Sequence, residues 1–209
     1  QMKTPGVYII EKNAFSNSVV EVATAIPAFI GHTQFARDGN KDLTGIPFRI
    51  SSMAEFHSFF GFAPTLRFGI RPEDSESEDT TNDINVLFPD GSCQLTLPKT
   101  FYALYYNMLL FYANGGGPCY IVSVGDYEHD FKSIDFTNAL LALKKEQEPT
   151  LVVVPEAVYM VEGDCYKVQT AALMHCGNDM KNRFAILDVF NGYKDENGAV
   201  IKSFRENIG

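Results

Sequence analysis

The sequence predicts an α/β fold with a mainly parallel sheet, helices on both faces and an extended N-terminal β arm. The first observation is that three apolar segments in the second half of the chain lack polar alternation, as buried strands do. The second is that helical segments of about ten to a dozen residues separate them, which predicts βαβ crossovers. The third is a short β-forming run near the first residue, behind a Pro-Gly turn.

The N-terminal run is predicted to be an arm, because a strand at a terminus has few neighbours of its own and is free to pair with another molecule. Its residues are Pro5, Gly6, Val7, Tyr8, Ile9, Ile10 and Glu11. The polar stretch Lys12–Ser18 is the expected connector. We therefore divide the chain into an arm and connector at 1–18, an irregular α+β region at 19–98 and an α/β core at 99–209.

The region after the connector begins with two short strand-like runs, Val19–Val22 and Ala28–Gly31. Ile26-Pro27 separates them, since proline lacks the amide donor of a continuous ladder. The charged, turn-rich stretch Arg37–Gly45 is predicted to be a loop.

A short helix is predicted next, capped by Ser51 or Ser52, running through Phe59 and closed by Gly61. Helical spacing predicts an apolar stripe that faces the core, rather than an aromatic ligand cage, made by Met53, Phe56, Phe59 and Phe60.

Residues 71–83 are strongly acidic and are predicted to form a solvated loop. Its carboxylates are Glu73, Asp74, Glu76, Glu78, Asp79 and Asp83. A calcium site is the alternative, although the central glycine and the final spaced glutamate of an EF-hand are lacking. A hairpin is predicted to follow, from Asn85–Leu87 to Cys93–Leu97 across Pro89-Asp90-Gly91.

The next predicted helix, at about 99–113, is apolar nearly all round and is expected to be buried on most sides. Gly115-Gly116-Gly117-Pro118 ends it. These glycines follow a helix and open a strand, whereas phosphate-binding glycines follow a strand and open a helix. The sequence therefore does not predict a nucleotide site here.

The α/β core is predicted from alternating elements: strands Tyr120–Val124, Leu151–Val154 and Phe184–Val189, and helices at about Phe136–Gln147 and Cys165–His175. Ligands of open α/β sheets gather beyond the carboxyl ends of the strands. The acids expected there are Asp126, Glu156 and Asp188, which could bind Mg²⁺ or act as general acid and base.

A capping or loop role is the favoured interpretation of these acids. The chain has no Gly-x-Ser-x-Gly nucleophile elbow, and the sequence places no histidine at a strand end of the core. His32 follows a strand-like run assigned to the other half, His57 lies on the aromatic helix, and His129 lies in a polar loop.

Composition is that of an ordinary globular protein, with 45% hydrophobic, 21% charged and 13% aromatic residues. The net charge of −9 and the absence of a basic stripe argue against binding to nucleic acid or to an anionic membrane. No apolar run approaches a membrane span, and residues 1–10 do not resemble a signal peptide. Assembly in the cytoplasm is the expectation.

The four cysteines, Cys93, Cys119, Cys165 and Cys176, are too sparse for a disulfide framework and are predicted to be buried thiols. A metal site at His175 and Cys176 with Cys165 is disfavoured, because neighbouring helical positions point about 100° apart. We expect no metal and no cofactor.

Four segments in order carry a resemblance: Pro5-Gly6-Val7-Tyr8-Ile9, Val22–Gly31, Ser52-Met53-Ala54-Glu55-Phe56 followed by Phe60-Gly61, and Asn114–Val122. This ordered set resembles the contractile tail sheath family, and is most similar to sheath subunits of phage-tail-like extracellular injection particles.

The resemblance implies a structural protein rather than an enzyme. Sheath subunits stack as rings around an inner tube and contract to drive it through a target envelope, in particles that also contain baseplate and cap proteins. An arm of one subunit adds a strand to a neighbour's sheet, which here would be residues 5–11. Family members are typically longer, so we expect this chain to be the N-terminal portion of such a protein. The alternative function is a Mg²⁺-dependent α/β hydrolase or phosphotransferase.

Overall fold

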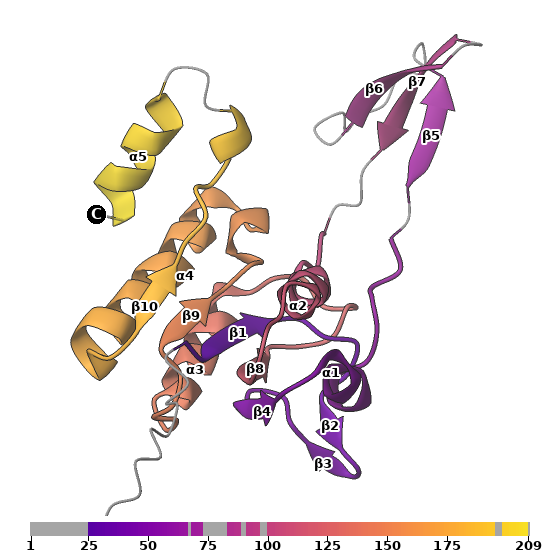
Figure 1. The fold of residues 1–209 in the computed structure, drawn as a ribbon. Helices are drawn as coiled ribbons and strands as arrows, with labels where there is room; N and C mark the ends of the chain where they lie inside the picture. Colours follow the sequence, from indigo (N-terminus) through magenta and orange to yellow (C-terminus); the bar gives the residue numbers. More distant parts are fainter. Residues whose placement is uncertain are drawn as a thin grey trace, which may run out of the picture.

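The computed structural model describes residues 25–66, 68–72, 83–88, 91–96, 100–194 and 198–208. Its centre is a five-stranded sheet with the order β10-β9-β1-β8-β4 (Figure 1). The strands are β1 (Pro27–Gly31), β4 (Phe48–Ile50), β8 (Cys119–Ser123), β9 (Leu151–Val153) and β10 (Phe184–Ile186). Only β4 runs antiparallel to its neighbour, so the predicted mainly parallel α/β fold is confirmed.

The central strand comes from the region that the sequence analysis kept apart from the α/β core. β1 pairs with β8 on one side and with β9 on the other, so the sheet draws on residues before and after position 98. Pro27 begins the strand, which is compatible with its missing amide donor. The run Ala28–Gly31 was predicted to be strand-like, but its central place in the sheet was not predicted, because its partners are more than 90 residues away along the chain.

Helices pack against both faces of the sheet, although not over its whole width. On one face, α1 (Met53–Phe60) and α2 (Leu104–Ala113) pack with Phe29 of β1 and Ile121 of β8. On the other, α3 (Ser133–Leu143) and α4 (Glu162–Met174) pack with the residues of alternate register, such as Ile30 and Val122. Strand residues point alternately to the two faces, so each strand contributes to both cores.

The predicted cap of α1 is confirmed. The Ser52 hydroxyl accepts a hydrogen bond from the Glu55 amide at 3.2 Å, while Ser51 donates through its amide to the Glu55 carboxylate at 2.7 Å. Gly61 ends the helix with φ of 86°, a conformation that favours glycine. Phe56 and Phe60 are fully buried, with Met53 and Phe59 against the same core, as the spacing predicted.

Helix α2 begins at Leu104, five residues later than predicted, and ends where Gly115 has φ of 83°. The expectation that it is buried on most sides is wrong. Leu110 is 65% exposed and Leu109 is 40% exposed, because α2 covers the sheet with one side only.

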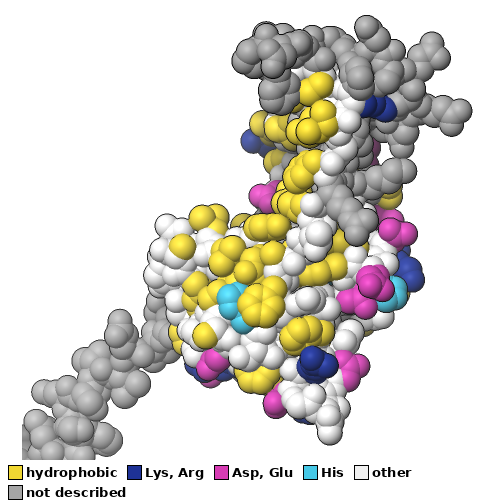
Figure 2. Space-filling view, turned by 90° about the vertical axis from the view of Figure 1, so that its right-hand side faces the viewer, with side chains coloured by type: hydrophobic (Ala, Val, Ile, Leu, Met, Phe, Trp, Pro, Cys, Tyr) yellow, Lys and Arg dark blue, Asp and Glu magenta, His cyan; other side chains and the backbone are white. Residues whose placement is uncertain are grey.

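A separate three-stranded antiparallel sheet projects from this body (Figure 1). Its strands are β5 (Gly69–Pro72), β6 (Asp83–Phe88) and β7 (Gly91–Thr96), in the order β5-β7-β6. The predicted hairpin is confirmed as β6 and β7, whereas β5 was not predicted. Figure 2 shows the molecule from the right-hand side of Figure 1. Hydrophobic side chains continue from the body toward the projecting sheet, and the lysines and arginines of this face lie apart from one another.

The remaining elements are short. They are β2 (Arg37–Asp38), β3 (Lys41–Asp42), the 3-10 turns η1 (Ala157–Tyr159) and η3 (Gly192–Lys194), the π-helix η2 (His175–Met180) and the helix α5 (Ala199–Ile208). β2 and β3 form a small hairpin inside the predicted loop 37–45. α5 was not predicted.

The arm residues 5–11, the connector Lys12–Ser18 and the run Val19–Val22 lie outside the described residues, as do positions 73–82 of the acidic loop. None of the helices in the described ranges combines the length and apolar character that a membrane span requires.

Candidate functional site

Two adjacent parallel strands of the sheet lead into a buried, hydrogen-bonded pair of side chains. His32 follows β1 and Glu156 follows β9, and the His32 Nδ1 lies 2.8 Å from the Glu156 Oε2. Both side chains are inaccessible to solvent, at 2% and 0% exposure. The expectation that no histidine lies at a strand end of the core is wrong, because β1, and with it His32, belongs to the middle of the same sheet.

The Glu156 carboxylate is fully used by the fold. Besides the imidazole, its Oε2 accepts the His32 amide at 2.9 Å, and its Oε1 accepts the Leu104 amide at 3.3 Å. Leu104 is the first residue of α2, so the carboxylate caps that helix and meets the positive end of its dipole. Glu156 thus joins β1, β9 and α2, which agrees with the capping role favoured from sequence.

The His32 ring is enclosed on its other sides. The rings of Tyr102, Phe131 and Phe136 have centroids 5.3, 5.1 and 5.7 Å from it. A Cβ atom at Gly125 would lie 3.3 Å from the ring Cδ2, so the backbone closes the remaining side. The imidazole therefore acts as a packed, hydrogen-bonded part of the core.

Two hydroxyl groups at the ends of β1 and β8 were missed by the sequence analysis. The Thr33 Oγ1 and the Ser123 Oγ lie 2.6 Å apart, and both residues are buried. The Thr33 Oγ1 also lies 2.9 Å from the Phe35 carbonyl oxygen, and the Ser123 Oγ lies 3.3 Å from the Gly125 carbonyl oxygen, so these three contacts share the two hydroxyl protons. Because these bonds hold the hydroxyls in place, neither is presented as a nucleophile.

Asp126 follows β8 and lies in an exposed turn. Its carboxylate accepts hydrogen bonds from the Glu128 amide at 2.9 Å and from the His129 Nδ1. The Glu128 amide, and after it His129, lowers the pKa of Asp126 below its usual value. The carboxylate therefore stays ionised at neutral pH.

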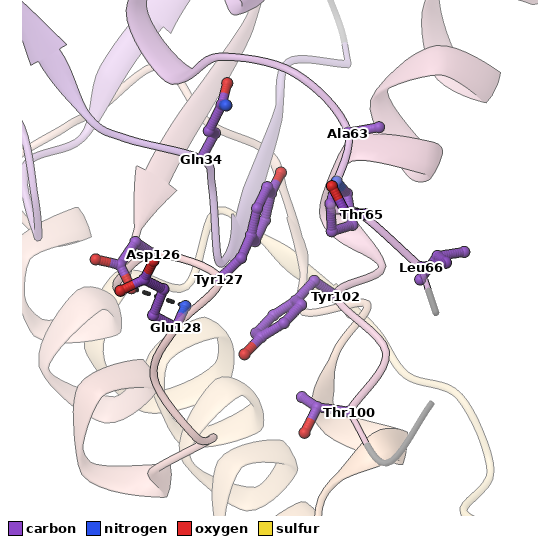
Figure 3. Close-up of a pocket in the computed structure, with 10 residues that line it drawn as sticks. Gln34, Ala63, Thr65, Leu66, Thr100, Tyr102, Asp126, Tyr127 and Glu128 are labelled. Atoms are coloured by element: carbon purple, nitrogen blue, oxygen red, sulfur yellow. Dashed lines mark hydrogen bonds between the residues drawn. The ribbon is translucent and has the colours of Figure 1, made fainter. Parts of the chain in front are cut away.

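A cavity of about 550 Å³ lies beside this turn (Figure 3). Tyr102 and Tyr127 project into it, with ring centroids 5.1 Å apart, between Asp126 and Glu128 on one side and the 63–66 segment on the other. Burial raises the pKa of both tyrosines.

The polar groups of this cavity are largely engaged. The Tyr127 hydroxyl donates to the Phe62 carbonyl at 2.9 Å and the Tyr102 hydroxyl to the His129 carbonyl at 3.0 Å. Two carboxylates, and no lysine or arginine of the described chain, line it. The cavity can therefore accept hydrogen bonds from a ligand, but it holds no activated nucleophile.

The three acids proposed for Mg²⁺ are not brought together. Glu156 is buried against His32, Asp126 faces solvent with His129, and Asp188 follows β10. Two strands separate β8 from β10, which places their ends about 14 Å apart. In the described ranges, no group of three His, Cys, Asp or Glu side chains is arranged to hold a metal ion.

The residues considered for a second metal site have other partners. The His175 Nε2 accepts a hydrogen bond from the Arg183 Nη1 at 2.9 Å. Arg183 also donates to the Leu143 carbonyl at 3.1 Å and to the Glu146 carbonyl, so this buried cation caps the end of α3. Burial raises the pKa of Cys165 to about 11, which keeps its thiol protonated.

His175 should make stability depend on pH. Burial, and after it Arg183, lowers its pKa from 6.5 to about 4, so the folded state holds it neutral. The unfolded chain binds the proton first, so this contribution is complete above pH 6.5 and is lost as the pH falls toward 4. We expect the free energy of unfolding to fall by about 3 kcal/mol over this interval.

The measurement is urea unfolding at several pH values between 6.5 and 4. His175→Gln keeps an acceptor for Arg183 and should flatten this part of the profile. An unaltered slope in His175→Gln would contradict the assignment.

In comparisons with known proteins, no protein-family model and no curated protein matches this chain.

Proposed function

We propose that this chain is a structural subunit of a contractile tail sheath, which polymerises around an inner tube and contracts to drive that tube through a target envelope. One observation supports this most directly. Three of the four segments that resemble the sheath family, far apart in sequence, contribute to one core: Phe29, Phe56, Phe60 and Ile121 pack in the same cluster. Segments that form one core are expected to be retained together.

The geometry of the carboxyl edge favours a structural role over catalysis. The buried carboxylate of Glu156 and the imidazole of His32 hold β1, β9 and α2 together, and the buried hydroxyls bond to each other and to backbone. A well-connected buried polar network rigidifies the body in which it lies. A subunit that transmits the displacement of a sheath needs such a rigid body.

In this proposal the arm, residues 5–11, adds a strand to the sheet of a neighbouring subunit, and Lys12–Ser18 is the connector. Main-chain hydrogen bonds keep the join intact while a connector permits rotation, and a head-to-tail contact that does not close generates an open helix. The partners are other sheath subunits, the inner tube, the baseplate and the cap. Assembly takes place in the cytoplasm, followed by residence in a phage tail or a released particle.

The arm deletion tests this proposal. The gene product that contains this chain is expressed with its inner-tube protein, with and without residues 1–11, and is examined by negative-stain electron microscopy. We expect hollow striated cylinders when the arm is present and isolated subunits when it is absent, because the inter-subunit strand is lost.

Deletion of residues 1–4 alone is the matched control, and it should still yield cylinders. Monodisperse particles in every sample would contradict the sheath function. Cylinders in every sample would support the sheath function but contradict the role of the arm in assembly.

A further inference from the structure

One half of one sheet face is uncovered. α1 and α2 lie at the β8 and β4 end of this face (Figure 1), whereas β9 and β10 expose apolar side chains on the same side. Phe184 is 77% exposed and Ile186 is 51% exposed. They pair with Leu151 and Val153, so the register places all four residues on one face, which we call the uncovered face.

A groove of about 550 Å³ runs between the uncovered face and α2. Its walls include Phe29, Phe111 and the 65% exposed Leu110, and none of its lining residues is charged. Parallel sheets are normally covered on both faces, and a contiguous apolar surface of this kind marks a contact site. The groove therefore calls for an uncharged, apolar cover.

The chain itself leads into this groove. Ala25, the first residue that the structure describes, is part of its wall beside Pro27 at the start of β1. We propose that residues 19–24 of the same chain lie across the uncovered face, over β9 and β10. β10 is two strand spacings from β1, or about 10 Å, and six extended residues reach about 20 Å.

The composition of this segment suits the groove. In the run Val19-Val20-Glu21-Val22-Ala23-Thr24, an extended backbone turns Val20 and Val22 to one side and Glu21 to the other. The valines meet Leu151, Val153 and Ile186, while the glutamate faces solvent.

Charge favours this segment over a second copy of the body. Residues 1–24 hold two lysines and two glutamates, so they are neutral and the whole net charge of −9 belongs to the remainder. Two bodies of like charge must offset their mutual repulsion with other contacts, whereas a neutral segment meets the uncharged groove without that cost. The inference does not rest on the proposed function, because the arm at 5–11 lies outside this segment.

The test uses the unassembled protein at low concentration. Val20→Asp combined with Val22→Asp should increase the fluorescence of the apolar dye ANS several-fold and accelerate amide hydrogen exchange at 151–153 and 184–186. Val7→Asp combined with Ile9→Asp places two charges in the arm instead and should change neither. Thermal unfolding of each variant verifies that the body is folded.

A disulfide test decides the matter independently of these variants. In a Cys93→Ser background, Val20→Cys with Phe184→Cys should form an intramolecular disulfide on oxidation, while Val20→Cys with Ile70→Cys should not. Equal yields from both pairs, or disulfides only between chains, would overturn the inference. An increase in ANS fluorescence for the variant with Val7→Asp and Ile9→Asp would also overturn it. The same holds if the amides of 184–186 are protected from hydrogen exchange only at high protein concentration. Neither experiment depends on the formation of cylinders. Failure of this inference can therefore be distinguished from failure of the sheath proposal.

Discussion

Glu156→Ala should lower the free energy of unfolding by about 3–5 kcal/mol, because it removes one partner from a buried pair. The substitution leaves the His32 imidazole and the amides of His32 and Leu104 without their acceptor in a region closed to water. It also uncaps α2 at its first residue. Urea unfolding followed by circular dichroism measures the change.

Glu128→Ala is the matched control, since Glu128 lies in the neighbouring turn and is exposed. It should cost less than about 0.5 kcal/mol. Glu156→Gln retains one acceptor oxygen and should fall between the two variants. Similar midpoints for Glu156→Ala and Glu128→Ala would show that the buried carboxylate does not hold β1, β9 and α2 together.

Phe60→Ala should cost about 3–5 kcal/mol, because it leaves a cavity in the core between α1 and the sheet. Phe60 is fully buried, with its ring centroid 5.4 Å from that of Phe56 and 6.2 Å from that of Phe48. The loss should appear as a lower midpoint of thermal unfolding.

Phe62→Ala removes the same side chain two residues later, where it is 56% exposed and stacks on His57 at 4.6 Å. This control should cost at most about 1 kcal/mol. If the two alanine variants unfolded alike, α1 would not be packed on the sheet through Phe60.

Elements with strong local signals were predicted from sequence. The cap at Ser52, the aromatic stripe of α1, the glycine end of α2 and the apolar strands β8, β9 and β10 each depend on residues within a few positions of one another. Their boundaries shifted by several residues, as at the start of α2, where the cap comes from Glu156, 52 positions away.

Elements with weak local signals were missed. β5 contains glycine and proline, and it becomes a strand because Ile70 pairs with Leu95 across the chain. The sequence of α5 looks like a charged stretch without a helix signal. Its contact with α4 is tertiary and is not indicated by its composition. The exposure of Leu110 was likewise unpredictable, because it depends on where the sheet ends relative to α2.

The candidate site shows the same division. Asp126 and Glu156 were recognised as acids at strand ends, but His32 was set aside, because nothing near it in sequence indicates that β1 is the central strand. Only the pairing of β1 with β8 and β9 brings His32 to Glu156, 124 positions later.

The sequence by itself determined the α/β class, the helical and extended segments with clear periodicity, and the resemblance to sheath subunits, since these depend on the order and spacing of residues along the chain. The tertiary structure decided which strand is central, which carboxylate is buried and which apolar face lacks a cover. Those properties arise from contacts between distant segments, whose burial and pairing are set only when the sheet is assembled.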